Sequence, residues 1–84
     1  MDYQVLILPP ARKDFEKLPK HDQARVREAL AAFPQSPRPP GCLKLKNSPY
    51  WRVRVGDWRI IYRIDDAART VTVARIRHRR EAYR

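Results

Sequence analysis

The sequence predicts a small α+β domain in which two helices near the amino terminus pack on one face of a small, antiparallel-rich sheet. Two observations lead to this fold. Apolar residues recur with the period of a helix before residue 34 and with the period of a strand after residue 50. The chain has 84 residues, a length that fits one domain with a small core. We therefore expect a single domain, residues 1–84, with the element order β-α-α-β-β-β.

Residues 5–8 form the first predicted strand, because four aliphatic residues in a row are typical of a strand buried on both faces. The two prolines that follow end the strand and open a short helix, since proline is tolerated in a first helical turn. In that helix Ala11, Phe15 and Leu18 share one side. Pro19 separates it from the next element.

A longer helix is predicted for roughly residues 21–33. Its apolar stripe follows the spacing i, i+3, i+4, i+7, which is the spacing of one helix face: Val26, Ala29, Leu30 and Phe33. Residues 34–42 then hold four prolines and a glycine, so we expect a stiff connector without regular structure, lying within the one domain.

Three further strands are predicted in the second half of the chain. Residues 51–55 alternate apolar and basic side chains, and Gly56-Asp57 is a good two-residue hairpin turn into the strand 58–64. A second turn, 65–69, leads to the strand 70–76. These strands form a meander beside which the first strand inserts, and the helices cover one face. The opposite face or its rim then presents the arginines.

Positive charge is concentrated in this second half. The whole chain has a formal charge of +10, and residues 43–84 hold 12 basic and 4 acidic side chains, a net +8. Because 43% of the residues are apolar, a folded module with a polyanionic partner is favoured over a disordered basic chain. Fourteen of the 19 basic residues are arginine, whose planar guanidinium binds phosphate and stacks on bases, and this preference suits an RNA partner.

Several classes of protein are excluded by composition. A single cysteine, Cys42, cannot form an internal disulfide, and with His21 and His78 it does not make a metal site of familiar spacing. No apolar run is long enough to span a membrane or to serve as the core of a signal peptide. We expect a cytoplasmic protein without a cofactor or metal and without membrane contact.

The candidate functional residues are the cations of the hairpin and of the last strand. Arg52 and Arg54 share one face of their strand, and Arg59 stands just across the turn, so it can join them. Trp51 and Trp58 are more typical of core packing than of base stacking. Other basic residues precede the meander or end the last strand, together with a histidine and a tyrosine, on what we expect to be one concave surface: Lys44, Lys46, Arg75, Arg77, Arg79, Arg80, His78 and Tyr83.

Several motifs resemble the RelE/ParE superfamily of bacterial and archaeal toxins. They are ARKDFEKLP at residues 11–19, LKLK at 43–46, RVGDWRIIYRI at 54–64 and RHRREAYR at 77–84. The resemblance covers nearly the whole chain and implies the same β-α-α-β-β-β fold. It also implies that the chain is the toxin of a toxin–antitoxin system, with a cognate antitoxin protein as its partner in a hetero-oligomer.

Two activities occur in this superfamily. RelE-like members cut mRNA in the ribosomal A site, and ParE-like members inhibit DNA gyrase and lack the basic and tyrosine constellation of the nuclease. By resemblance, Arg59, Arg79 and Tyr83 match that constellation, while Arg52 and Arg54 fall where lysine is frequent in RelE-type nucleases. The sequence therefore favours a ribosome-dependent mRNA endonuclease. A gyrase inhibitor and an RNA-binding module without activity remain the alternatives.

The reaction implied by the resemblance needs no metal. The 2′-OH of the mRNA attacks the adjacent phosphorus and leaves a 2′,3′-cyclic phosphate and a 5′-OH. Arginine can stabilise the charged oxygens, but it stays protonated near neutral pH and is therefore a poor base. The sequence therefore leaves two candidates for the base: His78, because imidazole is the side chain most often used as a general base, and Tyr83.

Overall fold

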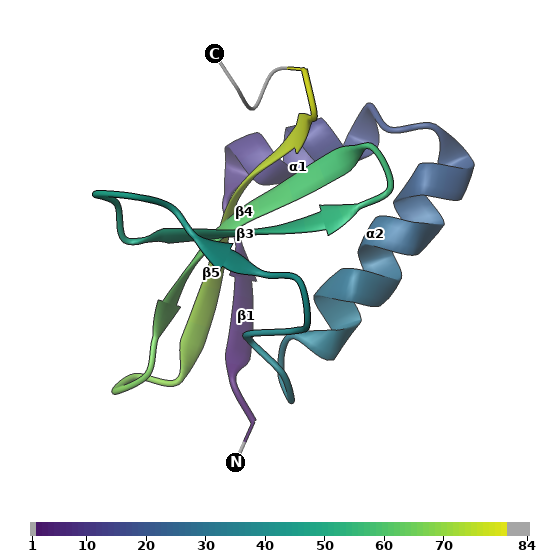
Figure 1. Cartoon of the computed structure of the whole chain (residues 1–84). Coiled ribbons are helices and arrows are strands. Elements are labelled where there is room, and N and C mark those ends of the chain that lie inside the picture. Colours follow the sequence, from purple (N-terminus) through teal and green to yellow (C-terminus); the bar gives the residue numbers. More distant parts are fainter. Residues whose placement is uncertain (1, 81–84) are drawn as a thin grey trace.

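The computed structural model describes residues 2–80, and it has the predicted order of helices and strands with one additional short strand (Figure 1). The additional strand comes directly after the proline-rich connector and is two residues long. The elements are β1 (Gln4–Ile7), α1 (Pro9–Glu16), α2 (Lys20–Ala32), β2 (Leu43–Lys44), β3 (Tyr50–Val55), β4 (Trp58–Asp65) and β5 (Thr70–His78).

The five strands form one mixed sheet in the order β1-β5-β4-β3-β2. Strands β2 to β5 are antiparallel neighbours in chain order, which confirms the predicted meander. Strand β1 runs parallel to β5. Parallel neighbours need a long connection, and here the two helices and strands β2 to β4 lie between them in the chain. The turn between β3 and β4 is the predicted Gly56-Asp57 pair, with Gly56 at a φ of +62°. A positive φ at the first central position suits a type II′ turn, which glycine adopts without a steric cost.

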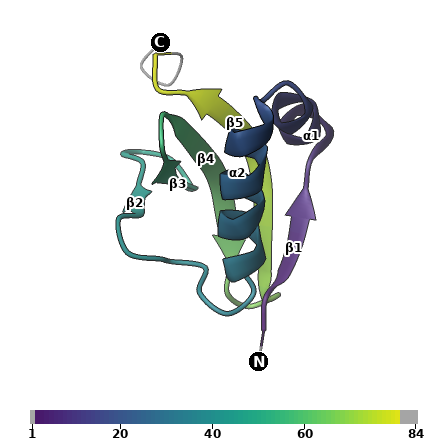
Figure 2. The ribbon, with the colours of Figure 1, turned by 90° about the vertical axis from the view of Figure 1, so that its right-hand side faces the viewer.

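Helix α2 lies across one face of the sheet, and α1 lies beside the end of β1 and contacts β5 (Figure 2). The stripe predicted for the longer helix supplies Val26 and Phe33 to the core, and Phe33 stacks against Tyr62 of β4 at 4.5 Å between ring centroids. The core therefore lies between the helices and one face of the sheet. Its buried residues are Ala11, Leu18, Val26, Phe33, Val53, Ile60, Tyr62, Val71, Val73 and Ile76.

The prediction that the first strand is buried on both faces was wrong. Strand β1 lies at the edge of the sheet, and Leu6 and Ile7 are exposed there, as is Leu8 directly after the strand. The physical reason is the position of β5, which has hydrogen-bonded neighbours on both sides and so occupies the inner place. An aliphatic run of four residues does not distinguish an inner strand from an edge strand.

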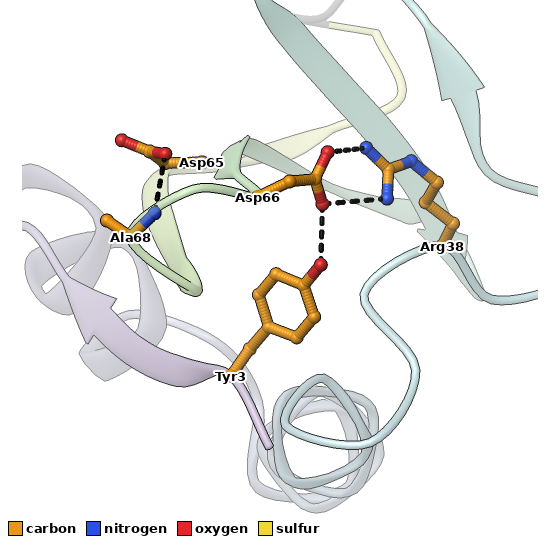
Figure 3. A network of polar contacts seen from close by, with 5 residues as sticks. All are labelled: Tyr3, Arg38, Asp65, Asp66 and Ala68. Atoms are coloured by element: carbon orange, nitrogen blue, oxygen red, sulfur yellow. Dashed lines mark hydrogen bonds and ion pairs between the residues drawn. The ribbon is translucent and has the colours of Figure 1, made fainter. Parts of the chain in front are cut away.

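One carboxylate joins the proline-rich connector to the turn between β4 and β5 (Figure 3). Asp66, in the turn between β4 and β5, accepts two hydrogen bonds from the Arg38 guanidinium, at 3.2 and 2.9 Å, and one from the Tyr3 hydroxyl at 2.5 Å. The hydrogen bonds from Arg38 and then from Tyr3 hold the pKa of the Asp66 carboxyl below its ordinary value. Three segments that are distant in the sequence are joined at this point.

Candidate functional site

The site begins with an irregularity in β5. Ile61 pairs with Arg75 and Tyr62 pairs with Val73, so Ala74 is an extra residue in β5, a β-bulge. Side chains alternate along a regular strand, and without the bulge Arg75 would share the core face with Val73. The extra residue instead turns Arg75 to the opposite face and keeps the buried Ile76 on the core face.

Three arginines form a row across the face of the sheet opposite the core. Arg54 of β3 pairs with Arg59 of β4, and Arg59 pairs with Arg77 of β5. Directly paired residues in antiparallel strands share a face, so the three side chains start from the same side. The bulge is what brings Arg77 into this row.

One end of this row is hollowed into a pocket of about 310 Å³ at the β3–β4 hairpin. Two of the three arginines of the row contribute to it, and a third arginine comes from the segment after β5. The lining residues are Arg54, Gly56, Asp57, Trp58, Arg59 and Arg79. We call this the hairpin pocket. Its concentration of guanidinium groups suits a phosphate-containing ligand.

Within the hairpin pocket Arg59 is buried and Arg79 is exposed. Arg59 has 3% of its surface exposed, and its Nη1 donates a hydrogen bond to the backbone carbonyl of Arg79 at 3.0 Å. The backbone N–H of Arg79 donates to the carbonyl of Asp57 at 2.8 Å. The side chain of Arg79 is 61% exposed, and its Nε lies 4.0 Å from Oδ1 of Asp57.

Asp57 is the pocket residue that the sequence analysis missed as a functional candidate. It served there only as a turn residue, and the structure places it among three arginines. The signal was available in the sequence, because the residues of a two-residue turn lie directly beside the ends of both strands that carry Arg54 and Arg59.

Arg52 and Arg75 lie outside the hairpin pocket. Arg52 lines a neighbouring hollow together with Arg54 and residues of the connector and β2. Arg75 donates two hydrogen bonds to the Asp14 carboxylate of α1, at 2.8 and 3.1 Å. It lines a separate pocket there with Lys13 and Lys17.

The two lysines and Arg80 are exposed and do not line the hairpin pocket. Lys44 of β2 donates from Nζ to the carbonyl of Ser48 at 2.8 Å, and Lys46 lies in the loop that follows. Arg80 follows β5 and donates its backbone N–H to His78 at 3.4 Å. Their predicted contacts with RNA remain predictions.

His78 lies on a different side of the sheet from the arginine row. It pairs with Trp58, and the two rings meet edge to face at 5.1 Å between centroids. Because Arg77 and Arg59 form the neighbouring pair, the alternation of side chains starts His78 on the helix side. Tyr83, the other candidate base, lies outside the described residues.

Both tryptophans have partners within the protein. Trp58 donates from Nε1 to Oδ2 of Asp22 on α2 at 3.0 Å. The guanidinium of Arg38 lies over the ring of Trp51 at 5.1 Å from the centroid. Packing inside the domain accounts for both rings, as the sequence analysis favoured.

Residues 2–80 contain no group of three or more histidine, cysteine, aspartate or glutamate side chains that could hold a metal ion. In the same residues no helix is both long enough and apolar enough to cross a membrane.

A small basic domain with an arginine-lined pocket beside a hairpin is a candidate polyanion-binding protein. Residues 5–83 match the family described as the ParE toxin of the type II toxin–antitoxin system parDE. The chain belongs to this family, within the RelE/ParE toxin superfamily, and is a toxin of a type II toxin–antitoxin system.

Individual relatives agree with this assignment. The chain is 36% identical to Toxin RelG of Mycobacterium tuberculosis, over 100% of this chain and 99% of that protein. Its structure is similar to the toxin–antitoxin complex RelBE2 of the same organism, with 31% identity, a TM-score of 0.80, and 93% and 99% of the two chains covered. The RelE–RelB complex of Pyrococcus horikoshii gives a TM-score of 0.84 at 26% identity, covering 94% and 97%.

Proposed function

We propose that this toxin is a ribosome-dependent mRNA endonuclease of the RelE type, which inhibits translation in the cytoplasm. The observation that carries the proposal is the hairpin pocket, in which Arg54, Arg59 and Arg79 gather beside one turn. The relatives support it, because Toxin RelG and the toxins of the RelBE2 and RelE–RelB complexes bear RelE-type names. The site residues add support through the matching positions of Arg59, Arg79 and Tyr83.

The proposed reaction is attack of the RNA 2′-OH on the adjacent phosphorus. The O2′–P bond forms, the P–O5′ bond breaks, and the products carry a 2′,3′-cyclic phosphate and a 5′-OH. Guanidinium groups held in the pocket before the substrate arrives can stabilise the negative charge that develops on the phosphoryl oxygens. In this proposal the toxin uses no metal or cofactor.

The base that takes the 2′-OH proton is proposed to be His78 or Tyr83. His78 is half-buried against Trp58, and its Nδ1 accepts a long hydrogen bond, 3.4 Å, from the backbone N–H of Arg80. That bond leaves Nε2 as the nitrogen for an external partner. Because His78 starts on the helix side of the sheet, RNA in the hairpin pocket would have to extend past the end of β5 to contact its imidazole.

The proposed partners are the ribosome with its mRNA and a cognate antitoxin protein. Four similar solved structures are toxin–antitoxin complexes, from M. tuberculosis, P. horikoshii, Methanococcus jannaschii and Escherichia coli. We infer that this toxin also forms a hetero-oligomer with an antitoxin, and that part of its positive surface serves the antitoxin.

The test is a reconstituted translation reaction to which the purified toxin is added. We expect mRNA cut on ribosomes, with 5′-OH and 2′,3′-cyclic phosphate ends at the mapped sites. Arg79→Ala and Arg54→Ala change exposed side chains of the pocket and should abolish or strongly reduce cutting while the far-UV circular dichroism spectrum stays unchanged. Unaltered cleavage by both variants would show that the hairpin pocket is not the site.

A ParE-like gyrase inhibitor is the second candidate, because the family description that matches residues 5–83 is that of the ParE toxin. A gyrase supercoiling assay separates the two. Inhibition of supercoiling by the toxin, with translation and mRNA intact, would replace the nuclease by the inhibitor. Salt-sensitive RNA binding without any cut product would instead favour an RNA-binding module without activity.

A further inference from the structure

A second basic pocket lies where α1 meets β5. It has a volume of about 270 Å³ and shares no lining residue with the hairpin pocket. The lining residues are Pro9, Pro10, Lys13, Asp14, Lys17 and Arg75. We call this the α1 pocket. Its three cations and one carboxylate give it a formal charge of +2.

The carboxylate of the α1 pocket is occupied inside the protein. Asp14 accepts hydrogen bonds from Nε and Nη2 of Arg75, at 2.8 and 3.1 Å, and from the backbone N–H of Ile76 at 3.0 Å. Its side chain is 17% exposed, whereas that of Arg75 is 43% exposed. Asp14 therefore orients the guanidinium of Arg75, and solvent reaches the positive member of this pair more easily than the negative one.

The two lysines of the α1 pocket carry the rest of its positive charge. Lys13 and Lys17 are four residues apart, so they lie on the same side of α1. Both are exposed, and within residues 2–80 neither ammonium group takes part in a salt bridge. Like charges at this spacing destabilise a helix. Helix stability therefore does not account for the pair, whereas an anion held between the lysines and Arg75 would relieve their repulsion.

The α1 pocket continues the positive surface of the sheet. Arg75 and Arg77 are two residues apart in β5, beyond the bulge, so both start from the face opposite the core. Arg77 belongs to the arginine row that ends at the hairpin pocket. Cations thus follow one another from that pocket across the sheet to α1. A polyanion with regularly spaced charges suits such a track better than a ligand with a single charge.

We propose that the α1 pocket is a second phosphate-binding site, in which Lys13, Lys17 and Arg75 hold a phosphodiester group of RNA. The site anchors the toxin on RNA at a distance from the atoms that react. It rests on the proposed function only for the identity of the ligand as RNA. The phosphate belongs either to the mRNA strand that enters the hairpin pocket or to ribosomal RNA, and the experiment distinguishes these two sources.

The measurement is the affinity of the toxin, at several salt concentrations, for a short oligouridylate and for small ribosomal subunits freed of mRNA. The double variant Lys13→Gln/Lys17→Gln should weaken binding roughly three- to tenfold. A loss with oligouridylate assigns the phosphate to the mRNA strand, and the slope of log affinity against log salt should then fall by about 0.7, the contribution of one phosphate in a single strand. A loss with the ribosomal subunits alone assigns it to ribosomal RNA.

Two matched variants serve as controls. Lys13→Arg/Lys17→Arg keeps both charges and should bind as the wild type does, within about twofold. Arg12→Gln/Lys20→Gln removes the same number of charges from exposed helical positions outside the α1 pocket, and it should also stay within about twofold, because charges away from the bound phosphate are screened by salt. Thermal unfolding of each variant shows whether it is folded.

Three results would overturn the α1 site. Unchanged binding of Lys13→Gln/Lys17→Gln to both RNAs would do so, as would equal weakening by Arg12→Gln/Lys20→Gln, which would reduce the effect to net charge. The third is a loss of affinity for a hexaglutamate peptide while binding to both RNAs is intact, because the pocket would then hold carboxylates of an acidic protein segment.

The cleavage assay separates this inference from the proposed function. A wild-type toxin that shows the expected losses of binding but cuts no mRNA on ribosomes would overturn the nuclease and leave the α1 site intact. If the toxin does cut, Lys13→Gln/Lys17→Gln should raise KM by the same factor as it weakens binding and leave kcat unchanged, because an anchor acts equally on the ground state and the transition state. A fall in kcat would overturn the anchoring role and place the pocket in the reaction itself.

Discussion

Asp14 on α1 and Ile76 on β5 are joined by a hydrogen bond in which the backbone N–H of Ile76 donates to Oδ2 of Asp14 at 3.0 Å. Strand β1 pairs with β5 only as far as Val73, so beyond that point the edge of β5 lacks a strand neighbour on this side. A side-chain carboxylate takes the place of the next strand. The same carboxylate binds the guanidinium of Arg75, so it fixes the part of β5 that leads to the arginine row.

Replacing Asp14 should therefore destabilise the domain. Asp14→Asn keeps the shape of the side chain but removes one acceptor and the charge, and we expect a loss of roughly 1–3 kcal/mol in the free energy of unfolding. Urea unfolding at neutral pH measures it. Glu16→Gln, an exposed change on the same helix, is the control and should stay within about 0.5 kcal/mol of the wild type. Equal stability of Asp14→Asn and the wild type would mean that the Asp14 carboxylate does not stabilise this edge of β5.

The pH dependence of stability provides a second check on the same contact. Partial burial acts to raise the pKa of the Asp14 carboxyl, but hydrogen bonds from Arg75 and from the backbone of Ile76 outweigh it, and the pKa lies below its ordinary value. A lowered pKa stabilises the folded state above the ordinary value, about 4, and this contribution is lost as the pH falls through the folded value. The difference in stability between the wild type and Asp14→Asn should shrink below about pH 4. A difference that stays constant down to pH 2 contradicts this assignment.

The sequence was sufficient for several features that depend on residues near one another in the chain. The strand alternation around Arg54, the Gly56-Asp57 turn and the helical stripe through Val26 and Phe33 were all predicted correctly. The proximity of Arg54 and Arg59 followed from the turn, because a two-residue hairpin fixes the register of its strands.

Features that depend on distant segments could not be predicted in this way. The edge position of β1 depends on where β5 inserts, and the buried Arg59 donates a hydrogen bond to the backbone of residue 79, 20 residues further along the chain. The bulge at Ala74 could have been suspected, because the apolar residues Val71, Val73 and Ile76 break the alternation of a regular strand. When the pairing with β4 is not known, however, such a break is equally consistent with the end of the strand.

Two tyrosine hydroxyls should respond to removal in opposite ways. Tyr62 is fully buried, and its hydroxyl has no hydrogen-bond partner among residues 2–80. Burial raises the pKa of this hydroxyl well above its ordinary value, and the neighbouring Cys42 adds to the rise. Tyr62→Phe removes a polar group that water cannot reach, so we expect equal stability or a gain of up to about 1 kcal/mol.

Tyr3→Phe is the matched change, because the Tyr3 hydroxyl donates to Asp66 in the network that ties the connector to the sheet. Its loss should lower the unfolding midpoint, and the effect should disappear in an Asp66→Asn background, where the charged acceptor is already gone. A destabilised Tyr62→Phe would reveal an acceptor for that hydroxyl that the described residues do not include.

Gly56 is required at the hairpin for two separable reasons. Its φ of +62° costs an L-residue about 1–2 kcal/mol, and a Cβ atom there would lie 2.9 Å from Nη1 of Arg25 on α2. Because Nη1 is the far end of a flexible side chain that can move aside, Gly56→Ala should be only slightly more destabilising than Gly41→Ala, which has a φ of +88° but open space around the new methyl group. In an Arg25→Ala background the two glycine variants should become similar. Thermal unfolding of the four variants measures these effects. If Gly56→Ala remains more destabilising than Gly41→Ala in the absence of the Arg25 side chain, the steric contribution is refuted.

The bulge at Ala74 leads to an unusual prediction, that deleting this residue preserves the fold. Deletion would join Val73 to Arg75, which already face the consecutive residues Tyr62 and Ile61 of β4, so both halves of the ladder keep their register. Only the bonds from Arg75 and Ile76 to Asp14 must adjust, and we expect the unfolding midpoint to fall by about 4–8 °C, the shift of roughly 1 kcal/mol in a domain of this size. Deletion of Thr72 is the control, because it lies in the regular part of β5 and slips the register by one residue. That variant should lose cooperative unfolding, and similar behaviour of the two deletions would show that the bulge does not set the faces of β5.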